Sequence, residues 1–171
     1  MSKDRMRHAR VDLPAYQFVV YQRPRSAQGK GISSATYLNA IKKEAAKHIL
    51  TPIVSDDVEV EICWATQARE GIRADIDNII KPTVDALGGI AFDDDKRVRS
   101  VTATLFDKNK NHTLSGYVED TGPLLFDNRE DAVQIAIYSD TRLNELGGED
   151  KVRKQRLIDF EKRFPKSLSG T

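Results

Sequence analysis

The alternation of side chains from Val58 to Trp64 constrains the fold of this chain more than any other feature of the sequence. The apolar residues Val58, Val60, Ile62 and Trp64 alternate with Glu59, Glu61 and Cys63. Successive side chains of a β-strand point to opposite faces of a sheet, so this period of two predicts a strand with one buried face. Cys63 lies within this run, and its expected role is packing rather than chemistry.

The segment before this strand has the spacing of a helix. Apolar residues recur there at intervals of three and four, Ser33 or Ser34 is a suitable N-cap, and Pro52 ends the pattern. The apolar positions of this expected helix are Leu38, Ile41, Ala45 and Ile49. A short β-rich run over Gln17–Tyr21 predicts a first strand, and the polar, glycine-containing residues 23–34 predict a loop.

The second half of the chain also alternates helical and strand patterns. A helical stretch ends at Gly88-Gly89, and Pro82 leaves open whether it begins there or has an irregular first turn. Two strands are then expected, around 101–105 and 133–137, and a charged helix within 147–171. The order strand, helix, strand, helix, strand, strand predicts an α/β fold of the α+β type, with one mixed sheet packed by two helices. The expected organisation is a basic flexible leader (1–13), a single small domain (14–138) and a C-terminal helical extension (139–171).

Composition excludes some classes of protein. No run of 18 apolar residues exists among the 171, so no membrane span is expected, and residues 1–10 lack the apolar stretch of a secretory signal. One cysteine suits a reducing compartment, so a cytoplasmic location is expected. The net charge is only +1, but residues 1–48 carry ten basic and three acidic residues, a charge of +7. Such a segment either neutralises phosphates or is an ordinary solvated surface, and both readings stay open.

The chemistry is concentrated in residues 75–95. Asp75 and Asp77 are two residues apart, so in extended backbone they face the same side, and Asp77 is placed to be a helix N-cap. The return of the chain after Gly88-Gly89 is expected to bring Asp95 beside them. Converging carboxylates repel one another unless a cation lies between them, and hard oxygen ligands favour Mg²⁺ or Mn²⁺. Lys81 is placed to contact a phosphate, although acidic residues beside turns are also common as plain loop residues.

Other motifs that bind metals or phosphates are absent. An EF-hand loop beginning at Asp75 requires glycine at position 80, where the chain has Ile80. The Gly29-Lys30 pair lacks the remainder of a P-loop, and no Cys-x-x-Cys or His-x-x-x-His spacing occurs. The three scattered histidines make zinc catalysis a poor hypothesis.

The segment resembles the signature of the RusA family of Holliday junction resolvases. Asp75-Ile76-Asp77-Asn78, Lys81, Asp85-Ala86-Leu87 and Asp94-Asp95 match the family's acidic, amide and basic positions in register, and Arg23–Gln28 looks like its N-terminal loop. The resemblance covers roughly residues 17–138. The chain departs from the pattern where Lys96 and Arg97 follow the acidic pair, and Asp93 leaves the last ligand ambiguous by one position.

The resemblance implies a homodimeric Mg²⁺-dependent endonuclease, with Mn²⁺ as a substitute, that cuts four-way DNA junctions in recombination and repair near the nucleoid. By position, it implies Asp75, Asp77 and Asp95 as metal ligands and catalytic residues, with Lys81 as the catalytic lysine. Asn78 and Asp94 would orient these groups. Asp85 also matches the family pattern, but its place in the middle of a helix favours structural hydrogen bonding over metal binding. The expected DNA-binding residues are Arg23, Arg25, Lys30, Arg73, Lys96 and Arg97. The alternatives are an inactive protein that binds branched DNA, and a metal nuclease acting on flaps or RNA.

Overall fold

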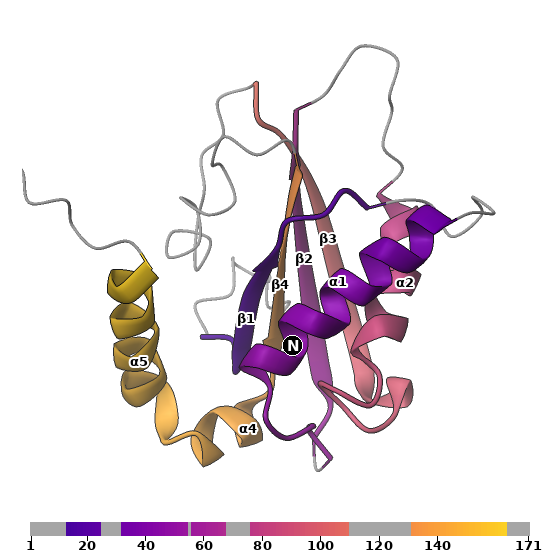
Figure 1. Cartoon of the computed structure of the whole chain (residues 1–171). Coiled ribbons are helices and arrows are strands. Elements are labelled where there is room, and N and C mark those ends of the chain that lie inside the picture. The colour runs from indigo at the N-terminus through magenta and orange to yellow at the C-terminus, as the bar shows by residue number, and fades with distance from the viewer. Residues whose placement is uncertain (1–12, 25–31, 55, 68–75, 110–130, 164–171) are drawn as a thin grey trace, which may run out of the picture.

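The fold is a four-stranded mixed sheet with two helices packed on one face (Figure 1). A computed structural model describes residues 13–24, 32–54, 56–67, 76–109 and 131–163. The strands are β1 (Tyr16–Val20), β2 (Val58–Thr66), β3 (Val98–Asp107) and β4 (Asp131–Tyr138), in the spatial order β1-β4-β2-β3. The helices on the sheet are α1 (Ile32–His48) and α2 (Asp77–Leu87). The predicted α+β class with a mixed sheet is confirmed.

The pairing of the strands explains their composition. β4 is antiparallel to both β1 and β2, whereas β2 and β3 are parallel. β4 lies in the middle of the sheet and is buried along its whole length, which fits its content of Ala, Val and Ile. β3 is an edge strand, and its residues are half-buried or exposed.

The parallel pair requires a crossover, because a chain that leaves one strand must return to the other end before it can run parallel to it. Helix α2 supplies that crossover, and β2, α2 and β3 form a β-α-β unit. Asp77, at the start of α2, therefore lies toward the C-terminal edge of the two strands, and Asp95, three residues before β3, lies at their N-terminal edge. Figure 1 shows α2 running alongside these strands. This topology determines where the predicted site residues lie.

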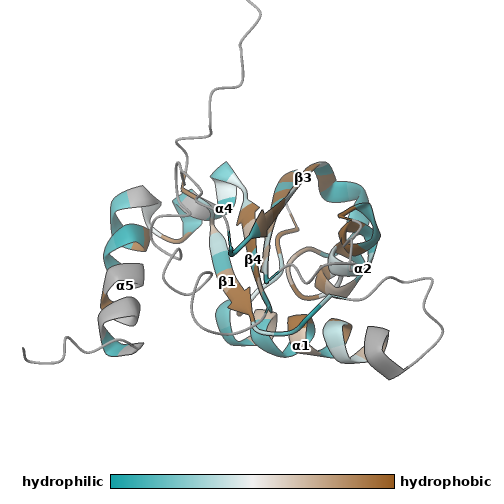
Figure 2. Ribbon diagram, turned by 90° about the horizontal axis from the view of Figure 1, so that it is seen from above, coloured by the Kyte–Doolittle hydropathy of each residue, from teal (hydrophilic) through white to brown (hydrophobic). Residues whose placement is uncertain are grey.

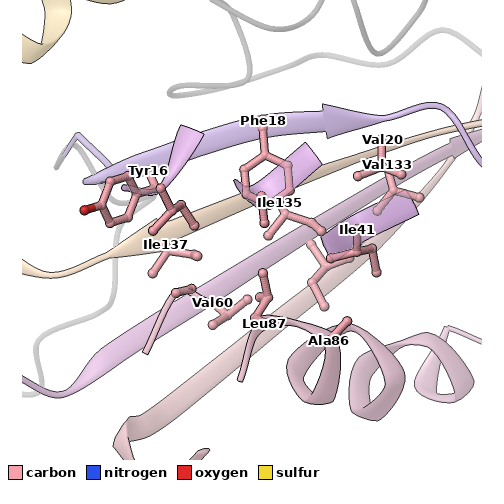
Figure 3. Packing of buried hydrophobic residues seen from close by; sticks show 14 of the residues in the cluster. Tyr16, Phe18, Val20, Ile41, Val60, Ala86, Leu87, Val133, Ile135 and Ile137 are labelled. Atoms are coloured by element: carbon pink, nitrogen blue, oxygen red, sulfur yellow. The ribbon is translucent and has the colours of Figure 1, made fainter. Parts of the chain in front are cut away.

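The main core lies between the sheet and the two helices. Figure 3 shows side chains of β1, β2 and β4 facing Ile41 of α1 and Leu87 of α2 in one layer. Within this layer the buried Tyr37 hydroxyl and the buried Thr83 hydroxyl are hydrogen-bonded at 2.9 Å, which joins α1 to α2. Burial raises the pKa of Tyr37 to about 12, so the phenol stays neutral at physiological pH.

The charged helix expected within 147–171 is present as α5 (Gly148–Arg163), and it is preceded by a further short helix, α4 (Asp140–Glu145), which was not predicted. Ser139 caps α4, since its hydroxyl accepts a hydrogen bond from the Arg142 backbone N–H at 3.1 Å and donates one to Asp56 at 2.8 Å. Seen from above (Figure 2), α5 stands apart from α1 and α2. No helix within the described residues is long and apolar enough to cross a membrane.

Cys63 is the packing residue that the sequence predicted, and its thiol is expected to be unreactive in the native protein. It is 2% exposed, and burial raises its pKa to about 12, with a further rise from the negative charge of Glu61. At pH 8 roughly one thiol in ten thousand is then ionised. Iodoacetamide should leave the native chain unmodified, as followed by mass spectrometry, and should label the chain once in denaturant. Rapid labelling of the native chain would contradict this environment for Cys63.

Candidate active site

Helix α2 presents a polar stripe to the solvent. Asp77, Lys81 and Asp85 are four residues apart, so they lie on one face of the helix, and all three are exposed. The opposite face is buried against the core and carries Ile79, Pro82, Thr83, Ala86 and Leu87. Pro82 lies within the helix, which begins at Asp77 and therefore well before it.

Asp77 is the first residue of α2 rather than its N-cap, which corrects the prediction. The cap is Ile76, whose backbone is helical (φ −62°, ψ −33°) and which makes no side-chain capping bond. A carboxylate in the first turn is stabilised by the helix dipole without being enclosed by backbone N–H groups. The exposed Asp77 carboxylate is therefore accessible to an external cation.

Lys81 pairs with Asp85 on the same face. Its Nζ lies 3.0 Å from both carboxylate oxygens of Asp85. The Lys81 side chain is 81% exposed, and such a pair between exposed i and i+4 residues stabilises a helix by only about 0.3–0.5 kcal/mol. A phosphate can therefore draw Lys81 away at small cost. The pairing agrees with the structural role predicted for Asp85.

The three consecutive aspartates before β3 have different environments. Asp93 forms an ion pair with Arg97, and this hydrogen bond lowers the pKa of Asp93. Asp94 caps the 3₁₀ turn η1 (Asp95–Arg97) by accepting the Lys96 backbone N–H at 2.9 Å, and this bond, followed by an interaction with Asp95, lowers its pKa. Asp95 is exposed and lies beside Asp94. Because Asp93 is already paired with Arg97, Asp95 is the better candidate for the last metal ligand.

The expectation that one chain brings Asp95 beside Asp77 is wrong. α2 rises about 15 Å from its first to its last residue, and Phe92 forms a bridge with Gly88 at the far end of the helix. Asp93 donates its backbone N–H to Ile53, and Val98 pairs with Val58 at the start of β2. Among the described residues, no group of three or more acidic, histidine or cysteine side chains is placed to hold a metal ion.

Several predicted residues fall outside the described part of the chain. These are Asp75 among the metal ligands and Arg25, Lys30 and Arg73 among the DNA-binding residues. Of the remaining cations, Lys96 is 88% exposed, whereas Arg97 is paired with Asp93. Asn78 is half-buried in the first turn of α2, next to Asp77.

Arg23 has a partner that no pattern in the sequence indicated. Its Nε lies 3.8 Å from an oxygen of Asp131, a carboxylate buried at the start of β4. The indole N–H of Trp64 donates to the other oxygen at 2.9 Å. These residues come from three distant segments, and Asp131 follows a region without clear periodicity, so the sequence offered no signal for the contact.

The fold and the exposed polar stripe of α2 define a small α+β protein with acidic and basic side chains on one open helix face. The family model described as "Endodeoxyribonuclease RusA" matches residues 16–114, and the chain belongs to this family. The comparison with curated proteins found no match. Family membership makes the chain a nuclease, a hydrolase acting on DNA, and supports Holliday junction DNA as its substrate.

Proposed function

We propose that this chain is a divalent-metal-dependent endonuclease that resolves four-way DNA junctions by paired incision, in DNA recombination and repair. The observation that carries the proposal is the exposure of Asp77 and Asp95, in a RusA-family chain, at the two edges of one β-α-β unit. Among the described carboxylates nearby, Asp93 is paired with Arg97 and Asp85 with Lys81.

The donor set suits Mg²⁺ or Mn²⁺. Asp77 and Asp95 offer carboxylate oxygens, Asp94 interacts directly with Asp95, and Asp75 is the third predicted ligand. Hard cations of this kind prefer such oxygens and coordinate them readily at exposed positions. When bound, the ion would polarise a phosphodiester and activate water for hydrolysis. Lys81 would bind the phosphate and stabilise the negative charge that develops on it.

The separation of Asp77 from Asp95 supports a homodimer in which each site takes residues from both copies. Two α2 helices packed antiparallel about a two-fold axis would bring Asp77 of one copy toward Asp95 of the other. Ile76, Ile80 and Val84 form a half-buried apolar stripe along α2, beside the polar one. A second copy covering this stripe would bury apolar surface and give two sites related by symmetry, as paired incision requires.

The test is cleavage of a synthetic four-way junction beside a linear duplex, a flap and an RNA duplex of the same sequence. The reaction is run with Mg²⁺, Mn²⁺ or EDTA. We expect symmetric cuts in two opposing strands of the junction, only with metal, and little cleavage of the linear duplex. Binding without cleavage in either metal would favour an inactive junction-binding protein, and preferred cleavage of the flap or RNA would overturn the proposed substrate.

Replacing Lys81 with alanine should slow junction cleavage by about 100-fold or more, because one group that stabilises the developing charge is removed. Single-turnover rates at saturating Mg²⁺ measure this effect, and the Mg²⁺ concentration for half-maximal rate should change little. Lys43→Ala, at an exposed lysine of α1, is the matched control and should retain the parent rate. A Lys81→Ala rate within a few-fold of the parent would make Lys81 an ordinary surface lysine.

A further inference from the structure

The buried carboxylate of Asp131 is unusual in this fold. Its side chain is only 5% exposed, although Asp131 is the first residue of β4 and so lies at the end of a strand. One oxygen accepts the Trp64 indole N–H at 2.9 Å, and the other lies 3.8 Å from Arg23 Nε. Burying a charged carboxylate is unfavourable, so a role in stability alone is a weak explanation for it.

The position of this cluster relates it to the proposed active site. Arg23 follows β1, Trp64 is in β2 and Asp131 begins β4, so the three meet at the edge of the sheet where β2 ends. Thr66, the last residue of β2, is paired with Asp131. The next helix along the chain after β2 is α2, whose first turn carries Asp77.

Arg23 keeps binding capacity after pairing with Asp131. A guanidinium has five N–H donors in a fixed planar fork, and the contact with Asp131 involves the Nε side. At 3.8 Å this contact is a charge interaction, longer than an ordinary hydrogen bond. The Arg23 side chain is 31% exposed, so it is held at the surface rather than enclosed. A planar fork held in this way is suited to bidentate binding of a phosphate.

We propose that Asp131 is a positioning residue that holds Arg23, with Trp64 fixing the carboxylate, so that Arg23 clamps a DNA backbone phosphate beside the incision site. This inference rests on the proposed function. In this arrangement Asp131 acts through Arg23, so it increases the affinity for DNA although it is itself negatively charged. A general electrostatic effect has the opposite sign, because a carboxylate near DNA repels the phosphates.

The opposite signs give a direct test with Asp131→Asn. Asparagine keeps the size of the side chain and an oxygen that accepts from Trp64, but it removes the charge that holds Arg23. Affinity for a synthetic four-way junction is measured in EDTA, which prevents metal-dependent cleavage, over a series of salt concentrations. We expect about tenfold weaker binding, the scale of one charge-assisted hydrogen bond. Equal or tighter binding by Asp131→Asn would overturn the inference.

Arg23→Ala provides a second variant and a thermodynamic cycle. It should weaken binding similarly and reduce the slope of log affinity against log salt by about one phosphate contact. The double variant Arg23→Ala with Asp131→Asn should bind no more weakly than Arg23→Ala, because Asp131 acts only through Arg23. Additive losses in the double variant would contradict this. Lys154→Ala, an exposed lysine of α5 remote from α2 in both views, controls for the loss of one positive charge (Figures 1 and 2).

Trp64 gives a spectroscopic signal that a purely structural ion pair would not produce. It is the single tryptophan of the chain, and it is bonded to Asp131. Junction binding should change the Trp64 emission of the parent, and Arg23→Ala should remove this change while retaining the parent's melting temperature. If the parent binds the junction but its Trp64 emission does not change, the role of Asp131 and Arg23 is overturned while the proposed function still stands. A parent that binds no junction at all would instead refute the proposed function.

Discussion

Asp77→Asn and Asp95→Asn are each expected to lower the rate of junction cleavage by about 100-fold or more, while junction affinity stays close to that of the parent. The physical reason is that cleavage needs carboxylate ligands for a divalent ion, whereas binding depends on contacts between basic side chains and phosphates. Asparagine keeps the size of the side chain but is neutral and a weaker ligand for a hard cation. Single-turnover cleavage in Mg²⁺ and binding in EDTA separate the two effects.

Asp93→Asn is the matched control for Asp95→Asn. The two residues are two positions apart and both are exposed, but Asp93 is already paired with Arg97. We expect Asp93→Asn to cleave at a rate within a few-fold of the parent. Parent-like activity of Asp77→Asn or Asp95→Asn would refute its assignment as a ligand, and a large loss in Asp93→Asn would move the last ligand to position 93.

The strands and the two packed helices were predictable because their signals are local. The alternation from Val58 to Trp64 reports a strand wherever its partners lie, and the spacing of Ile41, Ala45 and Ile49 reports the face of a helix. The short helix α4 was missed because six residues carry too little periodicity, although the Ser139-Asp140 pair is a usable capping signal.

The relative placement of the site residues was not predictable from the spacing that identified them. Spacing suggested that a helix and a turn return Asp95 to Asp77, which holds only if β2 and β3 are antiparallel. They are parallel, and a crossover helix places its two ends at opposite edges of the strands. The helical pattern between the two strand patterns was a usable signal for a parallel pair, but the spacing of the acidic residues carries no information about strand direction.

Contacts between segments that are distant along the chain could also not be predicted from the sequence. Tyr37 and Thr83 look like ordinary positions of two helices, yet their hydroxyls meet in the core at 2.9 Å. Arg23 was predicted to bind DNA from its charge and its place in a loop, but nothing local indicated a buried carboxylate behind it. Such pairs form when the elements pack together. Tyr37 and Thr83 are 46 residues apart along the chain, so no local pattern relates them.

The placement of Asp77 and Asp95 at opposite edges leads to the strongest expected effect, restoration of activity by mixing two inactive variants. If each site takes Asp77 from one copy and Asp95 from the other, a dimer of one Asp77→Asn chain and one Asp95→Asn chain has one site with both aspartates. Its second site has neither. If each site were built within one chain, both sites of the mixed dimer would lack one aspartate, and both would be inactive.

We therefore expect that a mixture of the two variants, exchanged by mild denaturation and refolding, regains cleavage at about one quarter of the sites, since half of the dimers are mixed and each has one intact site. A supercoiled plasmid with an extruded cruciform reports the outcome. The parent should give linear DNA by paired incision, whereas the mixture should give nicked circles, because a single active site cuts one strand.

Asp75→Asn mixed with Asp77→Asn is the matched control and should stay inactive, because these residues are two positions apart and belong to the same half of the site. Mass spectrometry verifies that chains of Asp77→Asn and Asp95→Asn have exchanged. Exchanged dimers that do not nick the plasmid would rule out a site shared between copies. Because Asp77 and Asp95 are separated within one chain, each chain would then need a different metal ligand.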